Sequence, residues 1–279
     1  MNKLTDVVTR GFLYLILVTR AIVFLFPFYW MVINSTLTNA QMFVYPPRLY
    51  PGRVFLDNVR QLLEVIPFHL NYLNSLIVST SRTVLMLFFC SLAGYAFAKH
   101  RFPGRKLLFA LMLGTMMIPQ GVSLIPWFVM MSFFGWVNSL KALIVPQIAT
   151  AFGIFWMRQY IESSVPGELI DAARIDGCSE FGIYWRVVAP VILPGLGALA
   201  IITFLSTWEE YMGPLIILKQ ASKYTIPVAL AVFQQGGGMP PNYVVMMTGV
   251  TLATAPILIV FLIASKQFIS NLTAGALKF

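Results

Sequence analysis

The stretch ELIDAARIDGCSEFGIYWRVVAPVILP, residues 168–194, gathers charged and small residues in a chain of which only 10% is charged. Strongly apolar segments lie on both sides of it. Ionised side chains are costly inside a bilayer and favourable in water. The contrast therefore predicts a water-exposed element that is held between segments that avoid water.

The composition places those segments in a membrane. Of the 279 residues, 58% are hydrophobic, and the mean hydropathy is +0.80. A soluble domain is normally about 45–50% apolar and about 25% charged. Six stretches approach the roughly 20 apolar residues that a helical crossing needs: 12–33, 72–98, 107–131, 140–161, 191–217 and 243–267. They predict an all-α integral membrane protein with about six transmembrane helices in a single domain, 1–279.

Prolines and basic residues refine this topology. Pro119, Pro126 and Pro146 interrupt the third and fourth spans, because proline removes a helical hydrogen bond. The link KHRFPGRK, 99–106, is rich in Lys and Arg, which favour the cytosolic side of a membrane. With this link inside, both termini and the 162–190 loop are cytosolic. The net charge of +9 therefore indicates a lipid surface as partner and not a nucleic acid.

Two of the segments on the opposite side carry local signals. Residues 57–66 have an amphipathic helical pattern, and residues 219–242 contain glycine and proline clusters typical of a flexible surface loop. We find neither an internal repeat nor a second soluble domain.

The polar stretch itself predicts two short helices with a break. Glu168 and Asp171 come early, where the positive end of a helix dipole favours acids. Gly177 suits the left-handed conformation that ends a helix. Ser179 then suits the N-cap of a second helix that continues through Trp185.

Small side chains in the first of these helices predict close contact with a partner. Ala172 and Ala173 are strong helix formers with almost no side chain. Leu169 and Ile170 flank them as apolar anchors, and the nearby charges would set orientation more than affinity. The stretch is thus predicted to dock another protein.

The order of these residues resembles a known motif, the EAA loop in permease subunits of bacterial ABC importers. The matching positions are Asp171-Ala172-Ala173, Asp176-Gly177, Phe181 and Ile192-Leu193-Pro194. Asp171 replaces the usual glutamate and keeps a carboxylate, and Cys178 stands where alanine is usual. Other segments look like the carbohydrate-uptake subgroup with its maltose-permease-G-like members: Gly94–Ala98, Arg101–Gly104, Trp208–Glu210 and Leu272–Ala276. Glu209 departs from the asparagine that usually follows this tryptophan.

The resemblance implies a type I ABC importer permease fold in a bacterial cell membrane, with a division of labour among subunits. A second permease completes the pore, and a dimer of cytosolic ATPase subunits binds ATP and Mg²⁺. An extracytoplasmic binding protein delivers a sugar, an oligosaccharide or a sugar derivative. The ATPase would be engaged by Glu168, Leu169, Asp171, Ala172, Ala173, Asp176, Gly177 and Phe181. This chain has no Gly-Lys dipeptide and hence no P-loop, so we expect no ATP hydrolysis and no cofactor in it.

A substrate path is predicted from five polar or aromatic residues: Ser79, Arg82, Trp208, Glu209 and Glu210. Each has a plainer interpretation, which for Trp208 is a position near a membrane boundary, where tryptophan is expected anyway. Arg82 either faces the bundle interior or lies near the interface and extends to water. Ser79 either lines the path or bonds one helix to another, and the two glutamates either meet solute or form a charged outer rim.

Other chemistry has little support. His69 and His100 are far from any Cys or acid cluster, so no metal site is expected. No nucleophilic side chain and general base occur together in a recognisable pattern, so no catalysis is expected. The alternative function is an ion-coupled secondary transporter. Such a carrier should show carboxylates near the middle of its spans, and the predicted spans have none there.

Overall fold

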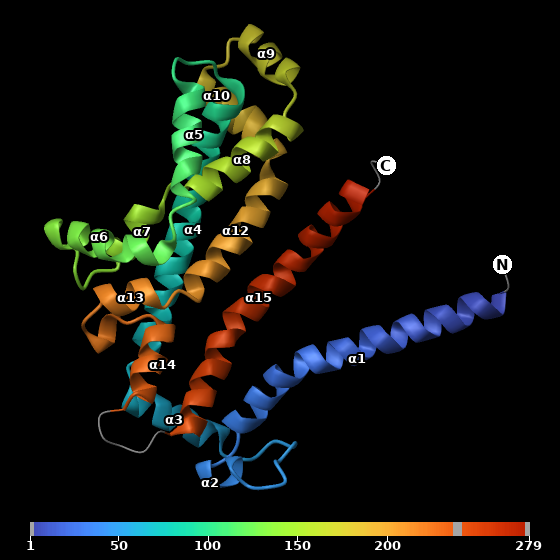
Figure 1. Cartoon of the computed structure of the whole chain (residues 1–279), viewed down its shortest axis with the longest axis vertical. Coiled ribbons are helices and arrows are strands. Elements are labelled where there is room, and N and C mark those ends of the chain that lie inside the picture. Colours follow the sequence, from blue (N-terminus) through green and yellow to red (C-terminus); the bar gives the residue numbers. More distant parts are fainter. Residues whose placement is uncertain (1–2, 237–241, 277–279) are drawn as a thin grey trace. The chain divides into compact units, whose positions relative to one another are not determined.

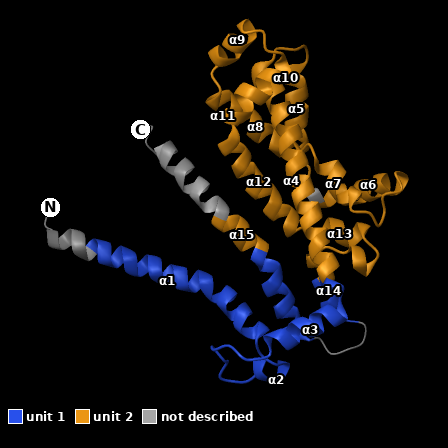
Figure 2. Ribbon diagram, turned by 180° about the vertical axis from the view of Figure 1, so that it is seen from behind, with its two compact units in different colours: residues 1–68, 230–255 blue, residues 69–229, 256–279 orange. Residues whose placement is uncertain are grey.

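The computed structural model describes residues 3–236 and 242–276 (Figure 1), with side chains for 9–119, 121–236 and 242–262. All regular structure in these residues is helical. The chain forms two compact units, residues 1–68 with 230–255 and residues 69–229 with 256–279 (Figure 2). The terminal Leu272–Ala276 motif and the ends Lys3 and Lys278 lie outside the described side chains.

The helices of unit 1 are α1 (Lys3–Ser35), α2 (Asn39–Met42) and α3 (Phe55–Val65). Unit 2 contains α5 (Arg105–Thr115), α6 (Gln120–Phe133), α7 (Lys141–Ile144), α8 (Ala151–Ser164), α9 (Gly167–Ile175), α10 (Glu180–Ile183), α11 (Ala189–Val191), α12 (Leu193–Trp208) and α13 (Met212–Ile217). It also holds two 3₁₀ turns, Val145–Gln147 and Ala221–Lys223, and a π-helical turn, Tyr184–Val188. Three helices are shared between the units: α4 (Phe68–Lys99), α14 (Ile226–Gln234) and α15 (Tyr243–Ala276).

In unit 1, the short helix α3 packs on the end of α1. The side-chain amide of Asn58 is buried and donates hydrogen bonds to the carbonyl oxygens of Ser35 (2.9 Å) and Leu37 (3.0 Å). Carbonyls at the end of a helix have no partner within it, so this amide satisfies groups that α1 leaves free. The amphipathic helix predicted for residues 57–66 is thus confirmed, with Leu62 fully buried.

Three helical segments are long and apolar enough to cross a membrane, namely Thr9–Ser35, Phe68–Lys99 and Tyr243–Leu262. They match the first, second and sixth predicted spans. A fourth candidate is a pair of helices, Glu180–Val191 and Leu193–Trp208, which meet at a bend of 78°. The described residues therefore offer three or four crossings by length and composition.

The other predicted spans are not continuous helices. The span predicted at 107–131 breaks between Thr115 and Gln120, where Pro119 precedes α6. The span predicted at 140–161 breaks at a 3₁₀ turn that contains Pro146. These breaks confirm that proline interrupts the segments, although Pro126 is accommodated inside α6. The span predicted at 191–217 is also wrong as a single helix, because α12 ends at Trp208.

The flexible loop predicted for residues 219–242 is wrong over most of its described part. Residues 226–234 form α14, and Ile226 and Val228 are fully buried. The backbone N–H of Ile226 donates to Ser75 Oγ on α4 (2.8 Å). The apolar run IPVALAVF buries a helix face, and this outweighs the turn-forming residues that follow. Residues 237–241, which include most of those turn formers, lie outside the described residues.

Helices α4 and α8 pack closely at Gly94, in the core of unit 2. A Cβ on Gly94 would lie 2.8 Å from Met157 Cβ and 2.9 Å from the backbone nitrogen of Arg158. Both distances are far below van der Waals contact, and backbone atoms of a packed helix do not move aside easily. Glycine at this position therefore sets the spacing between the two helices.

Replacing Gly94 with alanine should destabilise the chain by about 1–3 kcal/mol, the usual cost of overpacking a core. The matched control is Gly114→Ala in α5, where an added Cβ meets nothing within 4 Å. That change should raise stability by about 0.5–1 kcal/mol, since alanine is the better helix former. Thermal unfolding of both variants in detergent measures the difference. Equal shifts in the two variants would contradict the close approach.

Candidate functional site

The polar stretch folds as two helices with a break between them, as predicted. Helix α9 begins after Pro166 and ends at Ile175, and Gly177 adopts a left-handed conformation with φ of 79°. Ser179 caps α10, with its Oγ accepting a hydrogen bond from the Gly182 N–H (3.2 Å). The second helix differs from the prediction because its α-helical part ends at Ile183 and continues as a π-helical turn.

Helix α9 has an inner and an outer face. Ile170 and Ala173, which are 3% and 7% exposed, belong to a core cluster that includes Ile183 and Tyr184. Spacing of three or four residues places side chains on one face of a helix. Leu169, Ala172 and Ile175 accordingly turn outward, and Ile175 is 87% exposed.

This arrangement corrects the expectation that Ala172 and Ala173 both meet a partner. Ala173 faces the protein's own core, and so does the expected anchor Ile170. The other predicted coupling residues are exposed, and we call them, together with Ile175, the coupling surface: Glu168, Leu169, Asp171, Ala172, Ile175, Asp176, Gly177 and Phe181. Figure 2 shows α9 and α10 at one end of unit 2.

Glu180 ties the coupling surface to α4. Its Oε1 accepts a hydrogen bond from Arg174 Nε of α9 (2.9 Å), and its Oε2 accepts one from Tyr95 of α4 (3.3 Å). His100 Nε2 lies 3.4 Å from the same Oε2. The hydrogen bond to Glu180 raises the pKa of the Arg174 guanidinium, and Asp171 adds to this effect.

Further contacts from α4 reach the chain on both sides of α9. Lys99 Nζ donates to the carbonyl oxygen of Val165, just before the helix, at 2.6 Å. Ser91 Oγ on α4 lies 2.6 Å from the hydroxyl of Tyr184, the residue that directly follows α10. The coupling surface is therefore held to α4 from both ends, so that a displacement of α9 would be transmitted to α4.

The sequence pattern assigns no site role to Tyr95, Lys99 or Glu180. Tyr95 lies in a segment that resembles the family, Lys99 in the basic link and Glu180 in the polar stretch. No periodicity links residues 85 positions apart. The available signal was that Tyr95 places a hydroxyl at the end of an apolar span that is expected to meet this loop.

The residues predicted for a substrate path divide into buried and open ones. Ser79 and Trp208 are buried, and the Trp208 ring contacts Tyr72 edge to face at 5.6 Å between centroids. Glu209 is exposed, and Glu210 is partly exposed. Both glutamates lie in the break between α12 and α13.

Arg82 faces the protein interior. Its Nη1 lies 2.5 Å from Glu210 Oε2, and the two side chains are 14% and 33% exposed. Arg82 is near the middle of α4, about 21 Å of helix rise from Phe68 and about 25 Å from Lys99. The interpretation in which Arg82 extends to water at the interface is therefore replaced by an ion pair between α4 and the end of α12.

Comparison with known proteins adds a second line of observation. The family model described as "Binding-protein-dependent transport system inner membrane component" matches residues 90–273. The chain is 33% identical to the arabinooligosaccharides transport system permease protein of Bacillus subtilis (strain 168), over 92% of each chain. It is 34% identical to the lactose transport system permease protein of Rhizobium radiobacter, over 99% of this chain and 98% of that one. It is 30% identical to the sn-glycerol-3-phosphate transport system permease protein of Yersinia pestis, over 94% and 95%.

Solved structures share the fold. A chain from a bacterial ABC transporter involved in the import of the acidic polysaccharide alginate superposes with a TM-score of 0.84 at 22% identity, covering 95% of this chain and 98% of that one. A chain from the alginate transporter in complex with a periplasmic protein that binds alginate pentasaccharide gives a TM-score of 0.65 at 17% identity, covering 95% and 96%. The family match and the nearly full-length relatives show that this chain belongs to the binding-protein-dependent transport system inner membrane component family, as a permease subunit of an ABC importer.

Proposed function

We propose that this chain is one of two different permease subunits in an ATP-driven importer of a sugar, an oligosaccharide or a sugar derivative. Three relatives are named for arabinooligosaccharides, lactose and sn-glycerol-3-phosphate, which share a polyol character. The proposal includes six crossings of a bacterial inner membrane, two of them through the broken helices around Pro119 and Pro146. Both termini and the coupling surface lie in the cytosol.

The coupling surface is the observation that carries this proposal. Leu169, Ala172 and Ile175 form an exposed apolar strip on α9, and Phe181 adds an exposed ring nearby. Exposed apolar patches rimmed by polar residues mark protein interaction sites. The strip docks a cytosolic ATPase that binds ATP and Mg²⁺, while an extracytoplasmic binding protein brings the solute to the opposite side.

The contacts of Glu180 and Lys99 support a route for the coupled motion. A push on α9 reaches α4 through Glu180 and Tyr95, and through Lys99 and Val165. Helix α4 also carries Arg82, which holds Glu210 at the end of α12. One continuous helix thus joins the docking element to the charged break in the interior.

Membership in an ABC importer family does not favour an ion-coupled secondary transporter. The Arg82–Glu210 ion pair also argues against such a carrier. An ion-coupled carrier needs a carboxylate that gains and loses its cation during transport. Glu210 is instead compensated by the arginine beside it, which is a permanent cation.

Co-expression of this chain with candidate permease and ATPase subunits tests the proposal. We expect a stable complex that takes up solute into proteoliposomes only with ATP and with the solute-loaded binding protein present. A proton or sodium gradient without ATP should give no uptake. Uptake by the chain in vesicles without any ATPase would overturn the proposal.

A further inference from the structure

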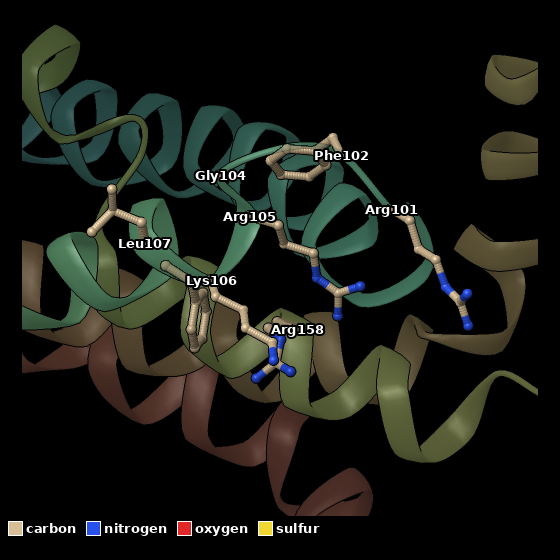
Figure 3. Close-up of a pocket in the computed structure, with 8 residues that line it drawn as sticks. Arg101, Phe102, Gly104, Arg105, Lys106, Leu107 and Arg158 are labelled. Atoms are coloured by element: carbon tan, nitrogen blue, oxygen red, sulfur yellow. The ribbon is translucent and has the colours of Figure 1, made fainter.

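A basic hollow lies where α4 passes into α5. It has a volume of about 690 Å³ and is formed by the 101–104 turn, the start of α5 and one side of α8 (Figure 3). Arg101, Arg105, Lys106 and Arg158 contribute to its lining, and none of the described residues that line it is acidic. Figure 3 shows the charged ends of Arg101, Arg105 and Lys106 on the side of the turn that faces Arg158.

The positive charge of this hollow is only partly compensated within the chain. Arg158 pairs with Glu162 (2.9 Å), and Arg105 donates to the carbonyl oxygen of His100 (3.0 Å). The side chains of Arg101 and Lys106 are exposed and form neither a hydrogen bond nor an ion pair with another described residue. Two unpaired cations beside two anchored ones favour an anionic ligand.

Apolar side chains complete the lining of the hollow. The guanidinium of Arg158 lies 4.4 Å from the ring centre of Phe109, and Phe102 also lines the space. Leu107 lines it as well and, with Leu108 and Leu111, is exposed on α5. A small hydrated anion would gain nothing from these carbon surfaces. A ligand with a charged head and a hydrocarbon tail would contact both features.

The position of the hollow matches the membrane boundary. It follows directly after Lys99, the last residue of the candidate span Phe68–Lys99. The excess of Lys and Arg in this link is typical of the cytosolic side, where anionic lipids attract basic residues. If Phe68–Lys99 crosses the membrane, charges placed here would lie at the level of lipid headgroups, and the exposed leucines of α5 would lie deeper.

We propose that this hollow binds one anionic phospholipid. The phosphate of its headgroup contacts Arg101, Arg105 and Lys106, and an acyl chain lies along Leu107, Leu108 and Leu111. The bound lipid fixes the 101–104 turn against α8. The site is independent of the solute and of ATPase docking, so the proposed function does not depend on it.

Lipid binding to the purified full-length chain tests this site. Native mass spectrometry in an uncharged detergent would measure the affinity for dioctanoyl phosphatidylglycerol and dioctanoyl phosphatidylcholine. We expect phosphatidylglycerol to bind about thirty-fold more tightly in the wild type. The double variant Arg101→Gln/Lys106→Gln should lose that preference. Thirty-fold is about 2 kcal/mol at 1.4 kcal/mol per tenfold, which is the worth of two basic residues at an anionic surface.

Two controls separate the site from general charge effects. Arg101→Lys/Lys106→Arg keeps both charges and should bind as the wild type does. Arg53→Gln/Lys219→Gln removes two exposed charges elsewhere and should also leave binding unchanged. Equal affinity for the two lipids, or an unchanged preference in the Gln variant, would overturn the proposal. Competition by inorganic phosphate or glycerol phosphate as strong as that of the lipid would show a free-anion site instead and would equally overturn it.

Discussion

An arginine in place of Ala172 is expected to reduce coupled transport strongly while the chain remains folded and inserted. Ala172 is exposed in the middle of the coupling surface, where a small side chain permits close contact. The few dominant contacts of an interface cluster near its centre and carry about 2 kcal/mol or more. The ATPase should therefore bind on the order of 30-fold more weakly, and solute uptake should fall in parallel.

The loss of transport is measured as ATP-dependent uptake in proteoliposomes, and the loss of docking as the amount of ATPase that co-purifies. Ala221→Arg is the matched control, because Ala221 is exposed in a short helical turn of unit 2 outside the coupling surface. It should transport normally. Ala173→Arg should behave differently from both, with less folded protein, since Ala173 faces the core. Normal uptake by the Ala172 variant would refute docking through this face.

The second large effect is expected at the Arg82–Glu210 pair. Arg82→Met leaves the Glu210 carboxylate without its cation in a largely enclosed site. Breaking a buried pair by removing one partner costs about 3–5 kcal/mol, whereas replacing both partners is often neutral. Because Glu210 is one-third exposed, about 3 kcal/mol is expected for Arg82→Met or Glu210→Gln alone, and much less for the double variant.

Thermal unfolding and uptake would be compared across the single and double variants. The control is Arg60→Met, which breaks the Arg60–Asp57 pair at 77% and 68% exposure. An exposed pair contributes about 0–1 kcal/mol, so this change should alter stability and uptake very little. If the double variant regains stability but not uptake, the pair takes part in transport as well as in folding. Additive losses in the double variant would contradict the pairing itself.

Local signals in the sequence predicted the coupling element well because its structure is decided locally. Gly177 takes the left-handed conformation that the turn needs, and Ser179 bonds a backbone N–H three residues on. Interactions of this kind involve neighbours in the chain, so residue type and spacing suffice. The same holds for the helix break at Pro119 and for the amphipathic α3.

The sequence was less informative wherever distant segments decide the outcome. Ala172 and Ala173 are identical in type, and only packing against Ile183 and Tyr184 makes one of them inner and the other outer. The glycine and proline residues near 236–241 suggested a loop, but burial of the preceding apolar run produces α14. The apolar residues on both sides of Glu209 and Glu210 likewise suggested one span, but the helix breaks there between α12 and α13.

The sequence by itself determined that this chain has membrane-spanning segments, that residues 168–181 form a polar two-helix element and that residues 1–279 have no Gly-Lys dipeptide of the kind a P-loop contains. Composition and short-range spacing carry that information. Only the tertiary structure decided which face of α9 is free, that Glu180 links it to Tyr95, and that Arg82 pairs with Glu210. The last two outcomes depend on side chains 85 and 128 positions apart, whose meeting follows from how whole helices pack.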